Sequence, residues 1–295
     1  MTKETLAGMT AVVTGASSGV GAAAARRLGA LGASVIVVGR SAVRTRDVAD
    51  EVGGEALPAD FTRFSEVRRL ADELLTRVPR IDILANNAGL VLADRRMTPD
   101  GHEQTIQVNF LSPFLLTSLL RERLSEAPAA RIINTSSSFY RFGELNPDDL
   151  DGNHRRYTRM RAYNTAKLAG VVHAAELNRR APRTVTATAF HPGTVRSGFD
   201  RGSKLVTAVK ASLAGRLVTQ SPEEGAEPLV RIATTDQAEL RNVFYNRLER
   251  ESFRHPAVTD AEFGALLWDR AGEITDAPPW PRPPIRTGAG DSAGR

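Results

Sequence analysis

Two residues with complementary chemistry, Tyr163 and Lys167, stand four positions apart in a stretch that we expect to begin a helix. Positions four apart share one helical face, so the phenol and the ammonium can be held close together. A phenol has a pKa of about 10, and an adjacent cation favours the phenolate, which moves tyrosine toward acid/base chemistry near neutral pH. The pair is therefore a candidate proton donor. The competing interpretation is an amphipathic surface pair with its lysine in water.

The basic residues are unevenly divided between lysine and arginine. Among 39 basic residues, lysine occurs only at positions 3, 167, 204 and 210, so Lys167 is less expected to be incidental. The net charge is +5, yet the arginines are scattered, and a coding bias toward arginine explains them better than a phosphate-binding face does. No basic cluster with interleaved aromatic residues appears, which argues against nucleic-acid binding.

The overall composition is that of an ordinary globular protein, with 41% hydrophobic and 25% charged residues. A length of 295 residues suits one large α/β domain or two small ones. The lack of cysteine excludes disulfides, cysteine nucleophiles and thiolate metal sites, and we expect no metal centre. Residues 1–8 contain no apolar segment, and residues 108–120, the most apolar stretch, are too few to cross a bilayer. We expect a cytoplasmic protein without a membrane span.

A glycine-rich segment near the N-terminus joins a predicted strand to a predicted helix. Residues 11–13 suit a short buried strand, residues 21–31 an alanine-rich helix, and residues 35–38 a β-branched parallel strand. The sequence TGASSGVG, residues 14–21, lies at the first junction. Glycines there permit positive φ and close backbone approach, and the exposed amides of a helix N-terminus bind phosphate. We interpret this segment as the pyrophosphate site of a dinucleotide, the alternative being a tight turn alone.

The end of the second predicted strand indicates which dinucleotide is bound. Folds that use NAD usually place a carboxylate about 20 residues after the glycines, where it binds the ribose 2′-hydroxyl. Here the sequence reads Gly39-Arg40-Ser41, with no carboxylate to repel a 2′-phosphate and a guanidinium able to pair with one. The sequence therefore predicts NADP(H), and the alternative is a solvated arginine at a strand end.

Strands and helices alternate along the rest of the chain. Strands are expected at 55–59, 81–85, 131–138, 184–190 and 242–245, and helices at 63–78, 102–124, 163–180 and from Ser221 onward. This alternation predicts an α/β fold, a single Rossmann-type, doubly wound parallel sheet of about seven strands with helices on both faces. Ligands bind such sheets at the carboxyl ends of the strands, where Gly15, Asp60 and Asn86 fall.

We expect one NADP-binding domain over residues 1–276, with substrate loops at 138–162 and 194–220. Residues 194–220 would act as a lid over the substrate. Residues 277–295 are rich in proline and glycine, which predicts a flexible tail or an extended segment along the surface.

In combination, these motifs resemble those of the short-chain dehydrogenase/reductase family. The shared features, in order, are TGASSGVG, Asn86-Asn87-Ala88-Gly89, a helix asparagine, a strand ending in serines, Tyr-x-x-x-Lys and a following Pro-Gly. The resemblance covers residues 9–250. The interval from Ser137 to Tyr163 is 163 − 137 = 26 residues, longer than is common in the family. That interval resembles the retinol-dehydrogenase-like branch, as do His191-Pro192-Gly193 and Leu267-Trp268.

The resemblance implies a role for each matching residue. Tyr163 would be the catalytic acid/base, and Lys167 would lower its pKa and hold the nicotinamide ribose. Ser137 would donate to the substrate oxygen, with Ser136 and Ser138 as the neighbouring alternatives, and Asn109 would position a water in a proton relay. The cofactor-binding residues would be Gly15, Ser17, Ser18, Gly19, Val20, Gly21, Arg40, Asp60, Phe61, Asn87, Ala88, Gly89, Tyr163, Lys167, Pro192, Gly193 and Val195, with Asn86 on the adenosine side.

Three aromatic residues, Phe139, Tyr140 and Phe142, follow Ser137, and the family places this stretch beside the substrate. They would form an apolar wall suited to a flat or lipophilic ketone or alcohol, and the alternative is core packing of a loop. Five arginines between positions 141 and 161 suit a solvated face better than an anionic-substrate site.

These expectations combine into a predicted function. The chain would be an NADP(H)-dependent oxidoreductase that interconverts a carbonyl and an alcohol on a hydrophobic or aromatic small molecule, by hydride transfer with Tyr163 as acid/base. The alternative is a redox-silent protein of the same fold, either an NADP(H)-binding sensor or a cyclase- or dehydratase-like enzyme. A homodimer or homotetramer is compatible with the sequence, and the substrate and the direction of reaction stay open.

Overall fold

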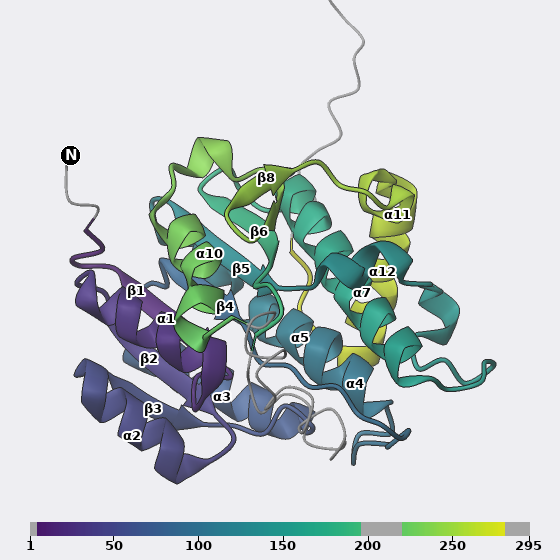
Figure 1. Cartoon of the computed structure of the whole chain (residues 1–295), viewed down its shortest axis with the longest axis horizontal. Coiled ribbons are helices and arrows are strands. Elements are labelled where there is room, and N and C mark those ends of the chain that lie inside the picture. The colour runs from purple at the N-terminus through teal and green to yellow at the C-terminus, as the bar shows by residue number, and fades with distance from the viewer. Residues whose placement is uncertain (1–4, 196–219, 281–295) are drawn as a thin grey trace, which may run out of the picture.

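The computed structural model describes residues 5–195 and 220–280. Within them, one sheet crosses the centre of the molecule in the strand order β3-β2-β1-β4-β5-β6-β7-β8 (Figure 1). Neighbouring strands from β3 to β7 run parallel, and β8 pairs antiparallel with β7. The strand bounds are β1 Thr10–Thr14, β2 Ser34–Gly39, β3 Glu55–Pro58, β4 Ile83–Asn86, β5 Ala130–Thr135, β6 Val185–His191, β7 Phe244–Asn246 and β8 Glu249–Glu251.

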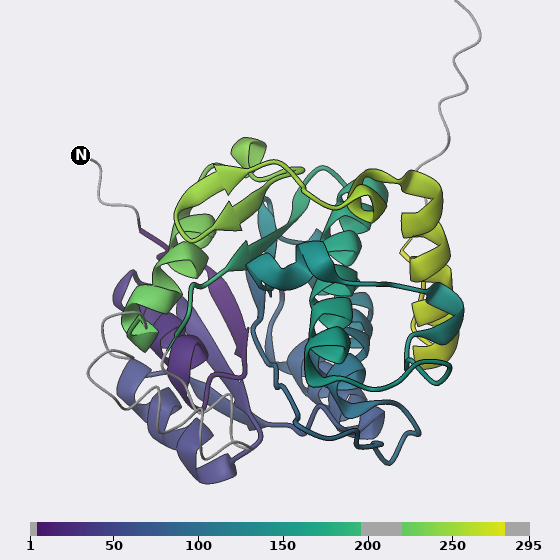
Figure 2. The same ribbon diagram turned by 45° about the vertical axis from the view of Figure 1, so that its right-hand side comes forward.

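Helices cover both faces of this sheet (Figures 1 and 2). The α-helices are α1 Gly19–Ala30, α2 Ala42–Val52, α3 Phe64–Arg77, α4 Gln104–Ile106, α5 Ser112–Leu119, α6 Arg121–Ser125, α7 Arg159–Arg180, α10 Pro222–Thr234, α11 Pro256–Thr259 and α12 Ala261–Thr275. Short 3₁₀ turns are η2 Ser138–Phe142, η3 Pro147–Asp149 and η5 Gln237–Glu239, and η1 Gln107–Leu111 is a π-helical turn. On one face, α1 packs on α2 and α10; on the other, α3 packs on α5, and α12 packs on α7.

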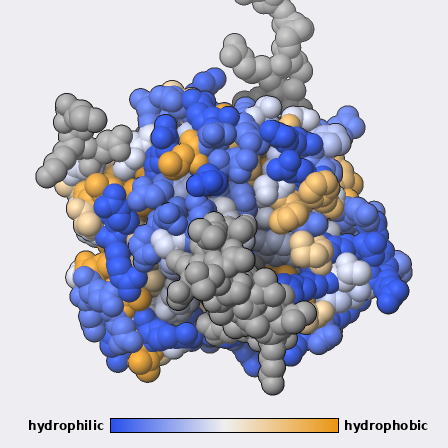
Figure 3. All heavy atoms as spheres, viewed as in Figure 1, coloured by the Kyte–Doolittle hydropathy of each residue, from blue (hydrophilic) through white to orange (hydrophobic). Residues whose placement is uncertain are grey.

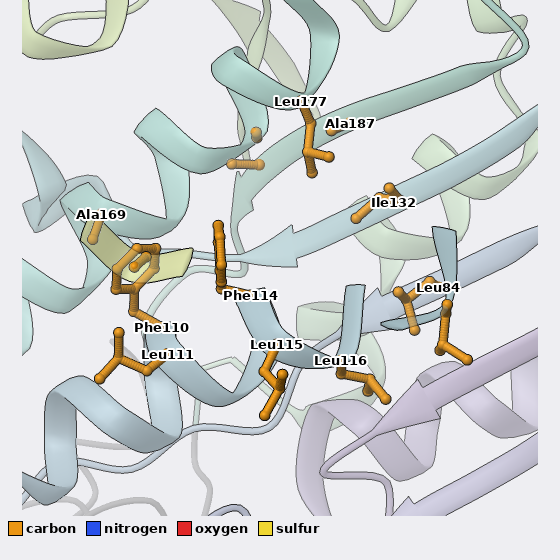
Figure 4. Packing of buried hydrophobic residues seen from close by; sticks show 14 of the residues in the cluster. Leu84, Phe110, Leu111, Phe114, Leu115, Leu116, Ile132, Ala169, Leu177 and Ala187 are labelled. Carbon is orange, nitrogen blue, oxygen red and sulfur yellow. The ribbon is translucent and has the colours of Figure 1, made fainter. Parts of the chain in front are cut away.

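The two faces carry two separate cores because successive residues of a strand point to opposite sides of the sheet. In β1, Val12 joins the core beneath α3, α5 and α7, whereas Ala11 and Val13 join the core beneath α1 and α10. In the first of these cores, Phe110 and Phe114 lie with Leu84 of β4 and Ile132 of β5 (Figure 4). A strand that is apolar on both sides is buried between two helix layers, which is the doubly wound arrangement expected from the sequence.

The predicted fold class is confirmed, with local differences. The sheet has one strand more than expected, because the short polar segment of β8 pairs with β7. The helix expected over 102–124 is instead a succession of α4, η1, α5 and α6. The start of α10 follows the prediction: Ser221 caps the helix through a capping box with Glu224, and proline occupies its first turn.

The C-terminal part packs more closely than its composition suggests. Of the tail expected over 277–295, the structure describes residues 277–280, and Trp280 is 2% exposed within the core. The lid expected over 194–220 lies outside the described residues apart from its ends, where Val195 pairs with Gln220. No helix in the described ranges is long and apolar enough to cross a membrane.

Candidate active site

A cleft of about 480 Å³ runs along the carboxyl ends of the parallel strands. Residues that follow β1, β2, β3, β4, β5 and β6 all line it, together with the first two turns of α7. The surface seen in the view of Figure 1 is mostly hydrophilic, with its apolar residues in small separate patches (Figure 3). Because its lining residues follow the carboxyl ends of the strands, the cleft lies where a doubly wound sheet binds its ligands.

The glycine-rich turn after β1 is shaped for close backbone approach. Gly15 has a φ of +66°, and a Cβ there would come within 2.7 Å of the Ala88 Cα. A Cβ on Gly21 would come within 2.5 Å of the Asn87 side chain. Ser18, the N-cap residue of α1, makes no side-chain capping bond, and the first turn of α1 lines the cleft. This leaves the N-terminal amides of a twelve-residue helix for an anion.

Polar bonds fasten this turn to the ends of the neighbouring strands. The Thr14 hydroxyl accepts from the backbone amides of Asn87 and Ala88, both at 3.0 Å. The Asn87 side chain donates to the Thr14 carbonyl and accepts from the Thr135 hydroxyl at 3.1 Å. Asn87, Ala88 and Gly89 all line the cleft, as expected. Asn86 does not: its side chain is buried against Thr117 and Asn134, so its expected place beside the adenosine is wrong.

Two arginines stand at the far end of the cleft, after β2. Arg40 was expected there, and Arg44, one turn into α2, lies beside it in the cleft wall. Within the described part of the chain, neither guanidinium takes part in an ion pair, whereas Arg26 pairs with Glu51. Arg44 was not expected from the sequence, since only the turn from β2 into α2 brings the first turn of that helix to the cleft. Next to the two arginines, after the neighbouring strand β3, the lining residues are Asp60, Phe61 and Thr62.

Ser137, Tyr163 and Lys167 come together at the opposite end of the cleft. Ser137, the N-cap residue of η2, hydrogen-bonds to the Tyr163 hydroxyl. The Lys167 Nζ lies 5.5 Å from the centroid of the Tyr163 ring and donates to the Thr135 carbonyl at 2.8 Å. The structure therefore brings together the three residues that the sequence picked out, with the lysine beneath the tyrosine ring.

Burial sets the pKa of both groups in this structure. It raises the pKa of the Tyr163 phenol to about 12, although the hydrogen bond with Ser137 opposes the rise. It lowers the pKa of the Lys167 ammonium to about 7. The direction for Tyr163 is opposite to the one expected from the Tyr-x-x-x-Lys spacing. The physical reason is that Lys167, itself desolvated and bonded to a carbonyl, does not offset the burial of the phenol.

The side chains of Ser136 and Ser137 have different partners. Ser136 points the other way and donates to the Lys167 carbonyl at 3.1 Å, so Ser137 is the serine beside the tyrosine. Asn109 sits in the π-helical turn η1, where its amide nitrogen donates to the carbonyls of Leu90 and Thr105 and its oxygen accepts from the Leu90 amide. Asn109 lies behind the cleft and lines a smaller cavity, together with Lys167.

Only part of the expected aromatic wall faces the cleft. Phe139 lines it, with Met160, Leu90 and Val91 completing an apolar mouth. Tyr140 is 2% exposed and packs on Phe244 of β7, because its hydroxyl accepts from the Arg254 amide at 2.9 Å and holds the ring in the core. Phe142 is 64% exposed and also lies outside the cleft lining. The expected substrate role does not fit the buried Tyr140, whereas for Phe142, whose ring centroid lies 6.2 Å from that of Phe139, it stays a prediction.

The segment after β6 closes the remaining side. His191, Pro192, Gly193, Thr194 and Val195 all line the cleft. Gly193 has a φ of +86°, a conformation that suits glycine. Burial lowers the pKa of His191 to about 4, so its imidazole is neutral at physiological pH. His191, which the sequence marks only as part of the His-Pro-Gly motif, is a further lining residue.

The fold and cleft define a class of protein: a nucleotide-binding α/β enzyme with a tyrosine, a serine and a lysine at one end of a dinucleotide cleft. The family model described as short chain dehydrogenase matches residues 9–205. The chain belongs to the short-chain dehydrogenase/reductase family, in its retinol-dehydrogenase-like branch. It is thus an oxidoreductase of a family that uses a nicotinamide cofactor.

Relatives at this level of similarity span nearly the whole chain. "Putative daunorubicin C-13 ketoreductase DnrU" of Streptomyces sp. (strain C5) is 41% identical, over 90% of this chain and 91% of its own length. Human retinol dehydrogenase 13 is 32% identical, over 92% of this chain and 86% of its own. The crystal structure of an uncharacterized protein from Mycobacterium paratuberculosis superposes with a TM-score of 0.75 at 31% identity, covering 94% of this chain and 96% of that one.

Proposed function

We propose that the protein is an NADP(H)-dependent oxidoreductase that interconverts a ketone or aldehyde and the corresponding alcohol on a lipophilic small molecule. The observation that carries this proposal is the hydrogen-bonded Ser137–Tyr163 pair, with Lys167 beneath the ring, in the same cleft as the glycine-rich turn. The names of relatives that reduce a ketone or oxidise retinol support the same reaction type.

The residues of the cleft fit a dinucleotide. The glycine positions where a Cβ would collide, together with the uncapped start of α1, leave room and amide donors for a pyrophosphate. The first turns of α7 then lie beside the other end of the same ligand. When bound, the nicotinamide supplies or accepts the hydride.

Each side chain then has a defined task. During reduction, negative charge develops on the carbonyl oxygen as its carbon gains hydride. Tyr163 transfers its phenolic proton to that oxygen, and the Ser137 hydroxyl stabilises the charge by donating a hydrogen bond. Lys167 stabilises the resulting phenolate through its charge. In oxidation the phenolate removes the alcohol proton, so the same residues serve both directions.

The cofactor preference rests on Arg40 and Arg44. Two guanidiniums without carboxylate partners in the described ranges face the end of the cleft that follows β2. Two neighbouring, solvent-exposed guanidiniums suit the charge of a 2′-phosphate, which a 2′-hydroxyl lacks. We therefore assign NADP(H) rather than NAD(H).

The substrate class rests on the mouth of the cleft. Phe139, Met160, Leu90 and Val91 present apolar surface near Tyr163. Phe139 is 47% exposed, so a ligand that covered its ring would remove apolar surface from water. A flat or extended lipophilic carbonyl compound fits this surface, in line with the daunorubicin and retinol named for the relatives.

The Tyr163→Phe variant tests the catalytic assignment. It removes one hydroxyl and leaves the ring in place, so kcat with NADPH and an aromatic or lipophilic ketone should fall at least about 10³-fold. The Kd for NADPH, measured by quenching of protein fluorescence, should change less than about threefold. Turnover close to that of the native enzyme would refute the assignment. Product formed without consumption of NADPH would instead identify a redox-silent enzyme.

The variants Arg40→Ala and Arg44→Ala test the cofactor assignment. Each should raise the Kd for NADPH about tenfold or more while leaving the Kd for NADH nearly unchanged, since a charge-assisted bond to phosphate contributes roughly 1.5–3 kcal/mol. Arg46→Ala is the matched control, because Arg46 lies on the same helix but does not line the cleft. Equal losses for both cofactors would show that these arginines do not read the 2′-phosphate.

A further inference from the structure

The turn between β7 and β8 meets the cleft wall that follows β6. His191, the last residue of β6, is paired with Asn246, the last residue of β7, in the parallel part of the sheet. The next residue of the hairpin is Arg247, whose backbone amide donates to the His191 carbonyl at 2.9 Å. The register therefore places the start of the turn beside Pro192, where the chain leaves β6 and lines the cleft.

The backbone of Arg247 has a conformation that is unusual for an arginine. Its φ is +58°, in the left-handed region, and it is the first of the two residues that join β7 to β8. Glycine, asparagine and aspartate are the common residues with positive φ in two-residue hairpin loops, because other side chains raise the energy there. An arginine held in this conformation points to a contact that its side chain makes.

That contact is with the side chain of Gln220. In the orientation of the Gln220 amide that satisfies all its neighbours, the oxygen accepts from Arg247 Nε at 3.1 Å and from Nη2 at 2.7 Å. The amide nitrogen then donates to the Pro192 carbonyl at 2.9 Å. The opposite orientation would set two oxygens against each other and the amide nitrogen against the guanidinium. Two donors from one guanidinium therefore hold the amide with its nitrogen toward Pro192.

Gln220 also holds the same wall through its backbone. Its amide donates to the Thr194 carbonyl at 2.8 Å, and it forms a parallel bridge with Val195. A Cβ on Gly193, whose φ is +86°, would overlap the Gln220 side chain, so glycine at this position lets that side chain reach the Pro192 carbonyl. The four wall residues, 192–195, all line the cleft, and one glutamine contacts each of them.

The far end of the wall is fixed by packing on two helices. A Cβ on Gly225 of α10 would come within 2.6 Å of a methyl group of Val195 and within 3.1 Å of one of Val20 in α1. Val20 and Val195 both line the cleft. The wall is thus held at one end by α1 and α10, and at the other by Gln220 and Arg247.

The wall stands across the sheet from Arg40. Arg40 follows β2 and Pro192 follows β6, and the strands between them are β1, β4 and β5. The start of α1, where the pyrophosphate would bind, follows β1. With the 2′-phosphate of the proposed cofactor at Arg40, its nicotinamide would therefore lie beside the wall after β6, on the side of the cleft that holds Tyr163.

We propose that Gln220 and Arg247 are positioning residues, which clamp residues 192–195 in the place where this wall meets the nicotinamide. Neither residue lines the cleft, so both act through the wall and not by contact with the ligand. The clamp itself follows from the contacts of the chain alone, whereas its effect at the nicotinamide rests on the proposed function.

The clamp is tested in the protein without ligand, by hydrogen–deuterium exchange at residue resolution. The Gln220 amide, which donates to Thr194, should be protected in the native protein. Arg247→Gly removes the guanidinium and suits the positive φ, so this amide should exchange at least about tenfold faster while Tm stays within about 2 °C. Arg247→Lys keeps one charged donor and should restore part of the protection. An Arg247→Gly protein with native exchange at Gln220 would overturn the clamp.

The matched control is Asn242→Gly. Asn242 is exposed, has a φ of +57° and does not line the cleft, so this substitution also replaces a residue of positive φ by glycine. Exchange of the Gln220 amide should stay within about twofold of the native rate. An increase as large as that in Arg247→Gly would count against the proposal, because it would follow from the freedom of a loop backbone and not from the lost guanidinium.

The role at the cofactor is tested by saturation-transfer difference NMR with NADP⁺, which compares how closely the nicotinamide and the adenine contact the protein. In Arg247→Gly and in Gln220→Met, the ratio of nicotinamide to adenine signal should fall at least about twofold, and in Asn242→Gly it should stay at the native value. A native ratio in the first two variants would refute the positioning role. Absence of any NADP⁺ signal with the native protein would refute the cofactor assignment and this role with it, while the exchange rates still decide whether the clamp exists.

Discussion

At Tyr163, burial and hydrogen bonding act against each other, and burial prevails. The pKa of the phenol is raised to about 12, so Tyr163 is protonated at neutral pH. Burial lowers the pKa of Lys167 to about 7, so its amine is only partly charged at that pH. A protonated phenol is the form needed to reduce a carbonyl, and a phenolate is the form needed to oxidise an alcohol. In the proposed reaction, a protonated Tyr163 favours reduction over oxidation near neutral pH.

A pH series should display this bias. Reduction of a ketone by NADPH should slow above about pH 7, because Tyr163 stays protonated while Lys167, whose charge stabilises the developing phenolate, loses its proton there. Alcohol oxidation with NADP⁺ should rise with pH over the same range and beyond, because its base is the deprotonated form of a group with a raised pKa. Initial rates followed by NADPH absorbance measure both. Oxidation that is faster at pH 6 than at pH 9 would contradict the argument.

Residue identities were predictable from the sequence where a motif fixes both type and position. Tyr163, Lys167 and the glycines of the first turn are such residues. The burial of Tyr140 in the core was not predictable, because only the fold brings the Arg254 amide to its hydroxyl and Phe244 to its ring. The same holds for Asn86, which differs from Asn87 by one position and points into the interior.

Among the elements, η2 fixes where Ser137 meets Tyr163. The turn packs directly on α7, and Gly143, at its end, lies so close that a Cβ would come within 2.7 Å of both the Asn164 carbonyl oxygen and the Leu168 Cβ. Asn164 is the residue after Tyr163. A displacement of η2 would therefore change the distance between the serine and the tyrosine.

Gly143→Ala should separate these two elements. The added methyl should destabilise the protein by about 1–3 kcal/mol and lower kcat at least about tenfold, because the Ser137 hydroxyl shifts from the Tyr163 hydroxyl. Gly272→Ala on α12 is the matched control, since a Cβ there meets nothing within 4 Å. It should leave kcat unchanged and stabilise the protein by about 0.5–1 kcal/mol. Urea denaturation and steady-state rates measure both, and a Gly143→Ala enzyme with native kcat would disprove the positioning by η2.

The main βα units follow from periodicity, but some elements do not. α2 buries only Thr45, Val48 and Ala49, so its apolar pattern is too weak to stand out, and the patterns described above do not predict it. β8 is a strand only because β7 offers it an edge, since its own residues are charged and exposed or half-buried. The π-helical turn around Asn109 likewise reflects the bonds of its amide to Leu90 and Thr105, which no local pattern encodes.

On the scale of the whole molecule, the C-terminal helix α12 completes the face that carries α7. Trp268 packs on Phe114 with centroids 5.0 Å apart, and the Arg180 guanidinium lies 4.9 Å from the indole. The sequence contained these residue types without indicating that they meet across more than 80 positions. Such long-range contacts tie the last described helix to the same core that holds the small cavity behind Lys167.

The two cores lie on opposite faces of one sheet, and residues from elements on both faces line the cleft. Gly15 and Arg40 follow the strands beneath α1, whereas Tyr163 and Lys167 belong to α7 on the other face. A dinucleotide that spans the cleft would therefore stabilise the molecule as a unit, by RT ln(1 + [L]/Kd), which is about 2.7 kcal/mol at a hundredfold excess over Kd.

Scanning calorimetry should show one unfolding transition, because the two cores cannot separate without breaking β1 and β4 from their neighbours. NADPH at about a hundred times its Kd should move the whole transition upward by roughly 5 °C or more. NADH at the same concentration should move it much less, because it has no 2′-phosphate to pair with Arg40 and Arg44. Two resolved transitions, of which NADPH moves only one, would show instead that the halves unfold independently and that the cofactor is held by one of them.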